Sequence, residues 1–167
     1  DDIWLSGTIG DPYIGYKYLK NKLNFDNKLL KKYYINSYYY PKPPHYHYIK
    51  LIKYINCAID ISDGFYGDLE KISVDFFKGA EIFTNAIPFS KNTIELINTK
   101  KIKFSELLTG GDDYQLLFTS NKENRHKIEK ISKVFNYKLT RIGIINNSKK
   151  VVFSGNNLKI QKKSYIH

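Results

Sequence analysis

Apolar residues recur along this chain with two different periods, which predicts a mixture of helices and strands. An apolar stripe with intervals of four, three and four residues is typical of an amphipathic helix, and its members are Phe65, Leu69, Ile72 and Phe76. The stretch from Cys57 to Ile61 is instead a compact apolar run interrupted by Asp60, the pattern of a buried strand. By the same criteria we expect further strands at residues 3–6, 80–83, 114–118, 139–144 and 150–153, and further helices from residue 12 and at 26–36, 45–56, 90–97, 104–108 and 122–135.

Residues that start and stop helices divide these elements and place them in one domain. Asp26 and Ser90 are the expected N-caps of two helices, and Gly110 with Gly111 is expected to end the helix over 104–108. The stretch PKPP at 41–44 breaks helix, but it is so short that we interpret it as a loop inside one domain. Helices and strands are interleaved, so the predicted fold class is α+β, a mixed β-sheet with packed helices, in one domain over residues 1–167.

The formal net charge of +11 raises the question of a nucleic-acid partner. The chain holds 25 lysines but only two arginines, and arginine supplies the planar fork that suits guanine and phosphate. Lys, Ile, Asn and Tyr make up 77 of 167 residues, and all four are encoded by A/T-rich codons. The composition therefore favours codon bias over a specific nucleic-acid partner, and a basic nucleic-acid-binding module stays as an alternative.

The remaining composition bears on location and completeness. The single cysteine, Cys57, excludes an internal disulfide and fits a reducing cytoplasm. No apolar run approaches the ~18 residues of a membrane span, so we expect no membrane partner. The chain has no methionine and begins Asp1-Asp2, from which we expect a processed chain or a piece of a longer one.

Three short segments place carboxylates beside glycine at the junctions of predicted elements: GTIGD (7–11), DISDG (60–64) and TGGDDY (109–114). Glycine lets backbone approach a ligand closely, and helix N-termini offer free N–H groups to phosphate oxygens. Carboxylates at the same place would repel a phosphate unless a cation lies between them. Mg²⁺ takes one or two protein carboxylates together with substrate phosphates, so the three segments predict a nucleotide or diphosphate site bridged by Mg²⁺.

Each segment also has a structural interpretation. Asp63 or Ser62 could cap the helix that starts at Gly64, and Asp11 could cap the helix that starts near residue 12. The pair Asp112 and Asp113 could form an ordinary turn. Asp60 is harder to explain this way, because a carboxylate inside a buried strand loses its hydration unless it is paired or metal-bound. His45 and His47 lack partners at zinc spacing and are interpreted as surface residues.

The order of the motifs resembles thiamine-monophosphate kinase. The matching stretches are GTIGD, YYPKPP, AIDISDGFYGDL, LLTGGDDYQLLFT, RIG at 141–143 and the closing KKSYIH. The resemblance runs along the whole chain but covers only the C-terminal half of that family. It therefore implies the fold of the C-terminal domain shared by the aminoimidazole ribonucleotide synthetase-related superfamily, with the N-terminal domain absent from this chain.

The resemblance also implies an activity and residue roles. The activity is ATP- and Mg²⁺-dependent phosphorylation of thiamine monophosphate to thiamine diphosphate, in a protein that is a homodimer when full length. By matching motifs, Asp60 and Asp63 resemble magnesium ligands, Ser62 an ATP contact, and Asp112 and Tyr165 substrate contacts, and no residue is assigned as catalytic. Without its N-terminal domain the chain is expected to be inactive. Another ATP-using relative of the same fold and a non-catalytic fragment remain alternatives.

Overall fold

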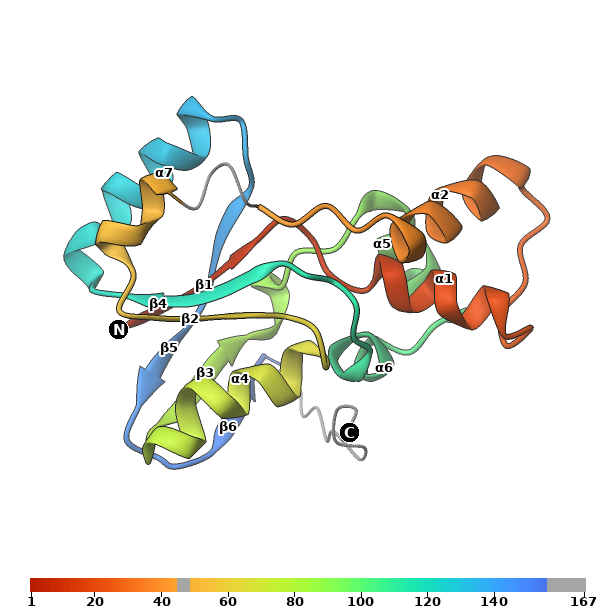
Figure 1. The fold of residues 1–167 in the computed structure, drawn as a ribbon. Coiled ribbons are helices and arrows are strands. Elements are labelled where there is room, and N and C mark those ends of the chain that lie inside the picture. The colour runs from red at the N-terminus through yellow and green to blue at the C-terminus, as the bar shows by residue number, and fades with distance from the viewer. Residues whose placement is uncertain (45–48, 156–167) are drawn as a thin grey trace.

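The computed structural model describes residues 1–44 and 49–155. These residues form a mixed six-stranded sheet in the order β2-β4-β1-β5-β3-β6 with helices packed on it (Figure 1), which confirms the predicted fold class. The β3–β6 pair is parallel and the other neighbouring pairs are antiparallel. The strands are β1 (Asp2–Ser6), β2 (Cys57–Asp60), β3 (Gly79–Phe83), β4 (Leu116–Ser120), β5 (Leu139–Asn146) and β6 (Val151–Ser154).

Helices cover both faces of the sheet because the central strand β1 is apolar on both sides. Ile3 and Leu5 belong to the larger core cluster, whereas Trp4 lies in a second cluster with Ile128. Alternate side chains of a strand point to opposite faces, so the two clusters are the two sides of the sheet. The α-helices are α1 (Asp11–Leu19), α2 (Lys28–Tyr39), α4 (Phe65–Ser73), α5 (Lys91–Asn98), α6 (Phe104–Thr109) and α7 (Arg125–Val134).

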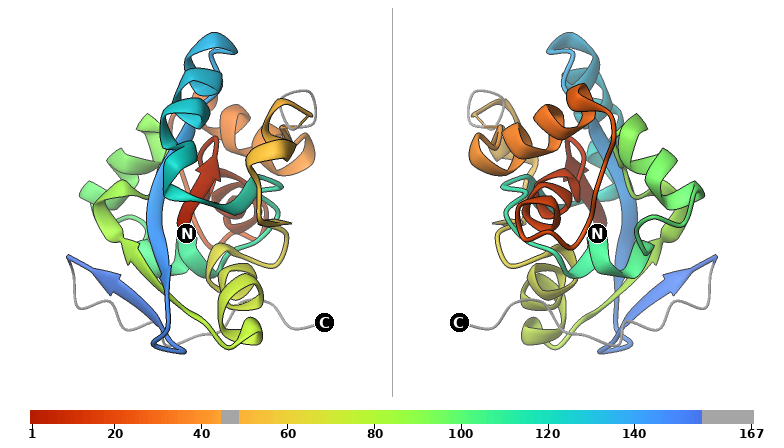
Figure 2. Two further views of the ribbon diagram at one scale, coloured as in Figure 1. Left: turned by 90° about the vertical axis from the view of Figure 1, so that its left-hand side faces the viewer. Right: turned by 90° about the vertical axis from the view of Figure 1, so that its right-hand side faces the viewer.

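The second core cluster lies under α7 and a short 3₁₀ helix, η1 (Ile52–Tyr54). The larger cluster takes side chains from α1, α2, α4, α5 and α6. Figure 2 shows β6 at the outer margin of the sheet, on the opposite side from α2. Within the described residues no helix is both long and apolar enough to cross a bilayer.

Several element boundaries differ from those predicted. The N-cap of α2 is Asn27, whose side chain accepts hydrogen bonds from the backbone N–H groups of residues 29 and 30, so the prediction of Asp26 as the cap was wrong. Ser90 caps α5 as predicted, through the N–H of Thr93. Of the helix predicted over 45–56, residues 49–54 are helical, residues 55 and 56 are not, and residues 45–48 lie outside the described part.

Two further differences have local physical causes. Phe76 does not continue the buried stripe of α4, because the chain tightens into a 3₁₀ turn at residues 74–76 and leaves this side chain 65% exposed. Strand β4 begins two residues later than predicted, at Leu116, because Tyr114 has a backbone φ of 51°, which no strand can accommodate.

The crossing of α1 and α2 depends on Gly15. A Cβ atom at this position would lie 2.1 Å from the carbonyl oxygen of Tyr34 in α2. Tyr34 is fully buried, and its hydroxyl group lies 3.1 Å from Oγ1 of Thr93 in α5. A glycine inside a helix costs stability on its own, and here the cost is offset by the close approach of two backbones.

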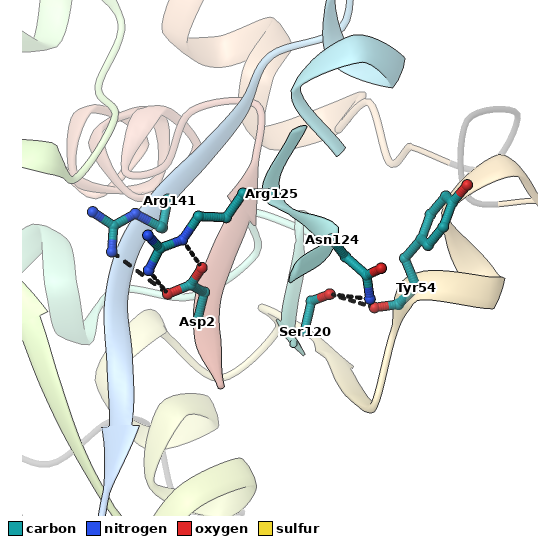
Figure 3. Close-up of polar contacts among 6 residues, drawn as sticks. All are labelled: Asp2, Tyr54, Ser120, Asn124, Arg125 and Arg141. Atoms are coloured by element: carbon teal, nitrogen blue, oxygen red, sulfur yellow. Dashed lines mark hydrogen bonds and ion pairs between the residues drawn. The ribbon is translucent and has the colours of Figure 1, made fainter. Parts of the chain in front are cut away.

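A buried carboxylate fixes α7 to the start of β1, at the end of the strand that lies away from GTIGD (Figure 3). Asp2 is fully buried and accepts hydrogen bonds from Nε and Nη2 of Arg125, the latter at 2.7 Å, and from Nη1 of Arg141 at 3.5 Å. Burial acts to raise the pKa of Asp2, but the bonds and charges of the two arginines outweigh it and hold the pKa below its usual value. Both arginines of the sequence therefore form intramolecular contacts with Asp2.

A second set of hydrogen bonds holds η1 against β4. The Ser120 hydroxyl group donates to the carbonyl oxygen of Tyr54 at 2.5 Å, and the side-chain amide of Asn124 donates to Ser120 Oγ at 3.4 Å (Figure 3). Together with the Asp2 contacts, these bonds hold η1 and α7 on one face of the sheet.

We predict that Gly15→Ala destabilises the protein by about 1–3 kcal/mol, because the added methyl group must push the α2 backbone away. The measurement is the free energy of unfolding in urea. Lys32→Ala, on the exposed side of α2, is the control and should change stability by less than about 0.5 kcal/mol. A Gly15→Ala protein as stable as the control would show that the two helices are not in close backbone contact.

Candidate functional site

The three glycine- and acid-containing segments meet at the ends of neighbouring strands, because of the directions in which these strands run. β1 and β2 both run antiparallel to β4. The C-terminal ends of β1 and β2 therefore lie on the same side of the sheet as the N-terminal end of β4 (Figure 1). GTIGD follows β1, DISDG includes the last residue of β2, and TGGDDY precedes β4.

Hydrogen bonds donated by backbone N–H groups join the three segments directly, to one carboxylate and two carbonyl oxygens. The N–H of Gly10 donates to Oδ1 of Asp113 at 2.7 Å. The N–H of Asp112 donates to the carbonyl oxygen of Ser62 at 2.9 Å, and the N–H of Tyr114 to that of Ile61 at 2.8 Å. The segments are thus one connected unit, although more than 100 residues separate Gly10 from Asp113.

Two glycines make this contact possible. A Cβ atom at Gly111 would lie 2.2 Å from the carbonyl oxygen of Ser62. One at Gly64, where φ is 118°, would lie 2.8 Å from the carbonyl oxygen of Thr109. A side chain at either position would separate the two turns, so glycine is required there for close approach.

The TGGDDY turn has an unusual backbone. Asp112 has a φ of 69° and Tyr114 a φ of 51°, both in the left-handed region that residues other than glycine rarely occupy. Such conformations are found at ligand sites when the surrounding structure enforces them. Burial raises the pKa of the half-buried Asp112 carboxyl, and the charge of Asp63 adds to this effect. Asp112 and Asp63 therefore share one electrostatic environment.

The DISDG turn is organised by Asp68, to which the sequence analysis gave no role. Asp68, fully buried in the first turn of α4, accepts hydrogen bonds through Oδ2 from the N–H groups of Ser62 and Asp63, both at 3.1 Å. Lys71 Nζ donates to Asp68 Oδ1 at 2.8 Å and to Asp63 Oδ2 at 2.7 Å. These two bonds raise the pKa of Lys71. The N-cap of α4 is Gly64 and has no side-chain cap, so the interpretation of Asp63 or Ser62 as a cap was wrong.

Asp60 does not have the environment expected from the sequence. It is the last residue of β2, which lies at the edge of the sheet, and its side chain is exposed. The argument that Asp60 is a desolvated carboxylate in a buried strand was therefore wrong. Its position does place it beside the turn, since its charge contributes, after burial and Asp112, to raising the pKa of Tyr114.

Asp11 has a structural environment. It is the first residue of α1, preceded by the N-cap Gly10, and only 6% of it is exposed. Its carboxylate accepts hydrogen bonds from the hydroxyl groups of Tyr33, Ser90 and Thr93 at 2.5, 2.7 and 2.6 Å. Burial, followed by the Asp11 charge, raises the pKa of Tyr33 to about 12. Asp11 thus ties α1 to α2 and α5, with no side-chain capping bond.

Asp113 is buried and is one of the residues that line a cleft of about 430 Å³. Residues that line this cleft include Thr8, Tyr33 and Lys42. Oδ1 of Asp113 accepts the bond from Gly10, whereas Oδ2 has no hydrogen-bond partner among the described residues. Burial raises the pKa of Asp113 well above its usual value, the Gly10 N–H opposes this, and the charges of Asp11 and Asp112 add to it. No pattern in the sequence separates this residue from Asp112.

Other sequence-predicted residues lie outside the site as the structure describes it. Tyr165 and both His45 and His47 fall in the ranges 156–167 and 45–48, which the structure does not describe. In residues 1–44 and 49–155, no three side chains of His, Cys, Asp or Glu are grouped so that they could hold a metal ion.

We predict that the stability advantage of Asp113→Asn over the wild type grows as the pH rises. The native carboxyl keeps its proton above the unfolded-state pKa of 3.8, so wild-type stability falls as pH rises through the window between the two pKa values. Asparagine retains the acceptor for Gly10 and does not titrate. Urea unfolding measured from about pH 4 to about pH 7 should show the two stabilities diverging. Parallel stability curves would contradict the raised pKa.

The sequence is similar to those of thiamine-monophosphate kinases. The kinase of Buchnera aphidicola subsp. Acyrthosiphon pisum is 33% identical over all of this chain and 52% of its own length. That of Buchnera aphidicola subsp. Schizaphis graminum is 35% identical over 92% of this chain and 50% of its own length. No protein-family model matches the chain.

Solved structures give the same result. The thiamine-monophosphate kinase of Stenotrophomonas maltophilia superposes with a TM-score of 0.80 at 28% identity, over 95% of this chain and 51% of its own. A ThiL protein complexed with AMPPCP and TMP superposes with a TM-score of 0.78 at 26% identity, over 98% of this chain and 50% of its own. HypE, in a complex with HypF, shares the fold at 20% identity with a TM-score of 0.67.

The sequence and structure matches cover the same share of the relatives' lengths. The chain spans about half the length of the relatives that it matches, as the C-terminal half predicted from the motif order would do. The chain is therefore a relative of the thiamine-monophosphate kinases along its whole length, which confirms the resemblance drawn from its motifs.

Proposed function

We propose that this chain is the C-terminal domain of an enzyme that transfers a phosphoryl group from ATP to thiamine monophosphate, giving thiamine diphosphate. Residues 1–167 form this domain, and the N-terminal domain comes from elsewhere in the full-length protein, which acts in the cytoplasm as a homodimer. The observation that carries the proposal is the convergence of GTIGD, DISDG and TGGDDY at one sheet edge, in a chain similar throughout to thiamine-monophosphate kinases. One of the matching structures is complexed with AMPPCP and TMP, which supports both substrates.

The proposed residue roles are those implied by the motifs that match the thiamine-monophosphate kinases. Asp60, the last residue of β2, and Asp63, in the turn that follows it, are the proposed magnesium ligands. Ser62, in the same turn, is the proposed ATP contact. Asp112 is the proposed substrate contact, hydrogen-bonded through its N–H to Ser62. Tyr165, outside the described residues, is proposed as a second substrate contact.

Asp60 and Asp63 fit Mg²⁺ as two carboxylate ligands of a site that other groups complete. Carboxylate oxygens are the ligands that Mg²⁺ prefers, and Asp60 and Asp63 are both at least partly exposed. The described residues do not assemble a three-carboxylate cage, so the remaining ligands would be nucleotide phosphates, water or groups of the other domain. When bound, Mg²⁺ would neutralise charge on the phosphates. The chain's own part is to hold the DISDG and TGGDDY turns in fixed relative positions.

Positioning of this kind accounts for most of the rate in phosphoryl transfer, since little covalent chemistry is required of the protein. The backbone bonds between the Ser62 and Asp112 turns set the distance between the proposed nucleotide and substrate contacts. The two turns pack closely, because a Cβ at Gly111 or Gly64 would overlap the backbone of the other turn.

Each of the alternative functions predicts a different observation. A different ATP-using enzyme of this fold would show ATP turnover that does not depend on thiamine monophosphate; the likeness to HypE concerns the fold alone. A module that reads nucleic-acid sequence would be expected to use arginines at the bases, but both arginines contact Asp2. A non-catalytic fragment would give no turnover with any second domain.

We predict that the purified chain alone does not form thiamine diphosphate from ATP and thiamine monophosphate. Joined to the N-terminal half of the Buchnera aphidicola relative, it should do so at about 1–100 s⁻¹, as kinases do. The measurement is thiamine diphosphate formed over time. Turnover by the chain alone would contradict the need for a second domain, and a completed protein that hydrolyses ATP without using thiamine monophosphate would contradict the kinase assignment.

In the completed enzyme we predict that Asp60→Asn and Asp63→Asn each lower turnover by about 30- to 10³-fold, or ~2–4 kcal/mol, because each removes a group that supports transition-state charge. Asp75→Asn is the control, the same chemical change at an exposed residue of the 3₁₀ turn that follows α4, and should leave turnover unchanged. Turnover of both variants at the wild-type rate would show that these carboxylates have no part in the reaction.

A further inference from the structure

Asp68 has the contacts of a residue that fixes the DISDG turn. It is fully buried, and one of its oxygens accepts the N–H groups of Ser62 and Asp63. Its other oxygen accepts Lys71 Nζ at 2.8 Å from the next turn of α4. Residues three apart in a helix lie on the same face, so Lys71 is held beside this carboxylate by the helix itself.

Lys71 also supplies the positive charge at Asp63. Its Nζ lies 2.7 Å from Asp63 Oδ2, and 45% of its side chain is exposed. The Lys71 ammonium group therefore lies at the carboxylate that the proposed function assigns to Mg²⁺. A lysine on a flexible four-carbon stem can leave one partner and keep another.

The two carboxylates differ in how firmly they hold Lys71. The Asp68 carboxylate is inaccessible, and its contacts are within the fold, whereas the side chain of Asp63 is 21% exposed. Moving Lys71 away from Asp63 would break one charge-assisted hydrogen bond and leave the one to Asp68 in place. A cation that arrives from solvent can thus reach Asp63 without disturbing the turn.

We propose that Lys71 is a built-in counter-ion, which occupies the cation position beside Asp63 and yields it to a divalent cation, while Asp68 holds the turn throughout. Lys71 and Asp68 are then positioning residues that set the affinity of the turn for the cation. The proposal rests on the proposed role of Asp63 as a metal ligand, and it is independent of which phosphate accepts the transferred group.

The test is the affinity of the 167-residue chain for Mn²⁺, measured by calorimetry, with no nucleotide and no turnover. Lys71→Gln should bind Mn²⁺ about five- to tenfold more tightly than the wild type, because a competing positive charge is gone. Lys71→Arg keeps that charge and should bind as the wild type does. Asp63→Asn should lose the binding.

Lys78→Gln is the control for a general loss of positive charge, since Lys78 is exposed and donates to Asn147 rather than to a carboxylate. Its affinity for Mn²⁺ should equal that of the wild type. Equal or weaker binding by Lys71→Gln, an equal gain in Lys78→Gln, or no binding by any of the proteins would overturn the proposal. A failed kinase assay with tighter binding by Lys71→Gln would reject the proposed reaction and leave the counter-ion role intact.

Discussion

The candidate site depends on the backbone contact between the turn that follows β2 and the turn that precedes β4. The Asp112 N–H reaches the Ser62 carbonyl oxygen at 2.9 Å, and this is possible only because Gly111 has no side chain. The antiparallel pairing of β2 with β4 brings the two turns to the same edge, and the glycine then allows them to touch. The acids of both turns are crowded together as a consequence.

The crowded carboxylates fall into two groups by burial. Asp11, Asp68 and Asp113 are buried, and each accepts hydrogen bonds that join separate parts of the chain. Asp60, Asp63 and Asp112 are partly or largely exposed at the edge of the sheet. The buried acids therefore build the site, and the exposed acids are those available to a ligand. The proposed magnesium ligands and the proposed substrate contact Asp112 all belong to the second group.

The two ends of β1 show two ways to accommodate negative charge. At its start, Asp2 is neutralised by the guanidinium groups of Arg125 and Arg141, and burial with two permanent charges makes this a fixed part of the fold. Beyond its other end, the charge of Asp63 is balanced by Lys71, and here the carboxylate itself is 21% exposed. The difference suits a structural contact in the first case and an exchangeable cation in the second.

The sequence by itself determined the elements, because apolar periodicity reports which face of each segment is buried. It located β1, β3 and α5 to within a residue or two at each end, and the glycine–acid segments identified the kinase resemblance. It failed where the outcome depends on neighbours far along the chain. Periodicity gave Asp60 a buried strand, but β2 lies at the sheet edge, which strand order alone decides. The burial of Asp113 but not Asp112 likewise follows from packing between segments that the sequence keeps apart.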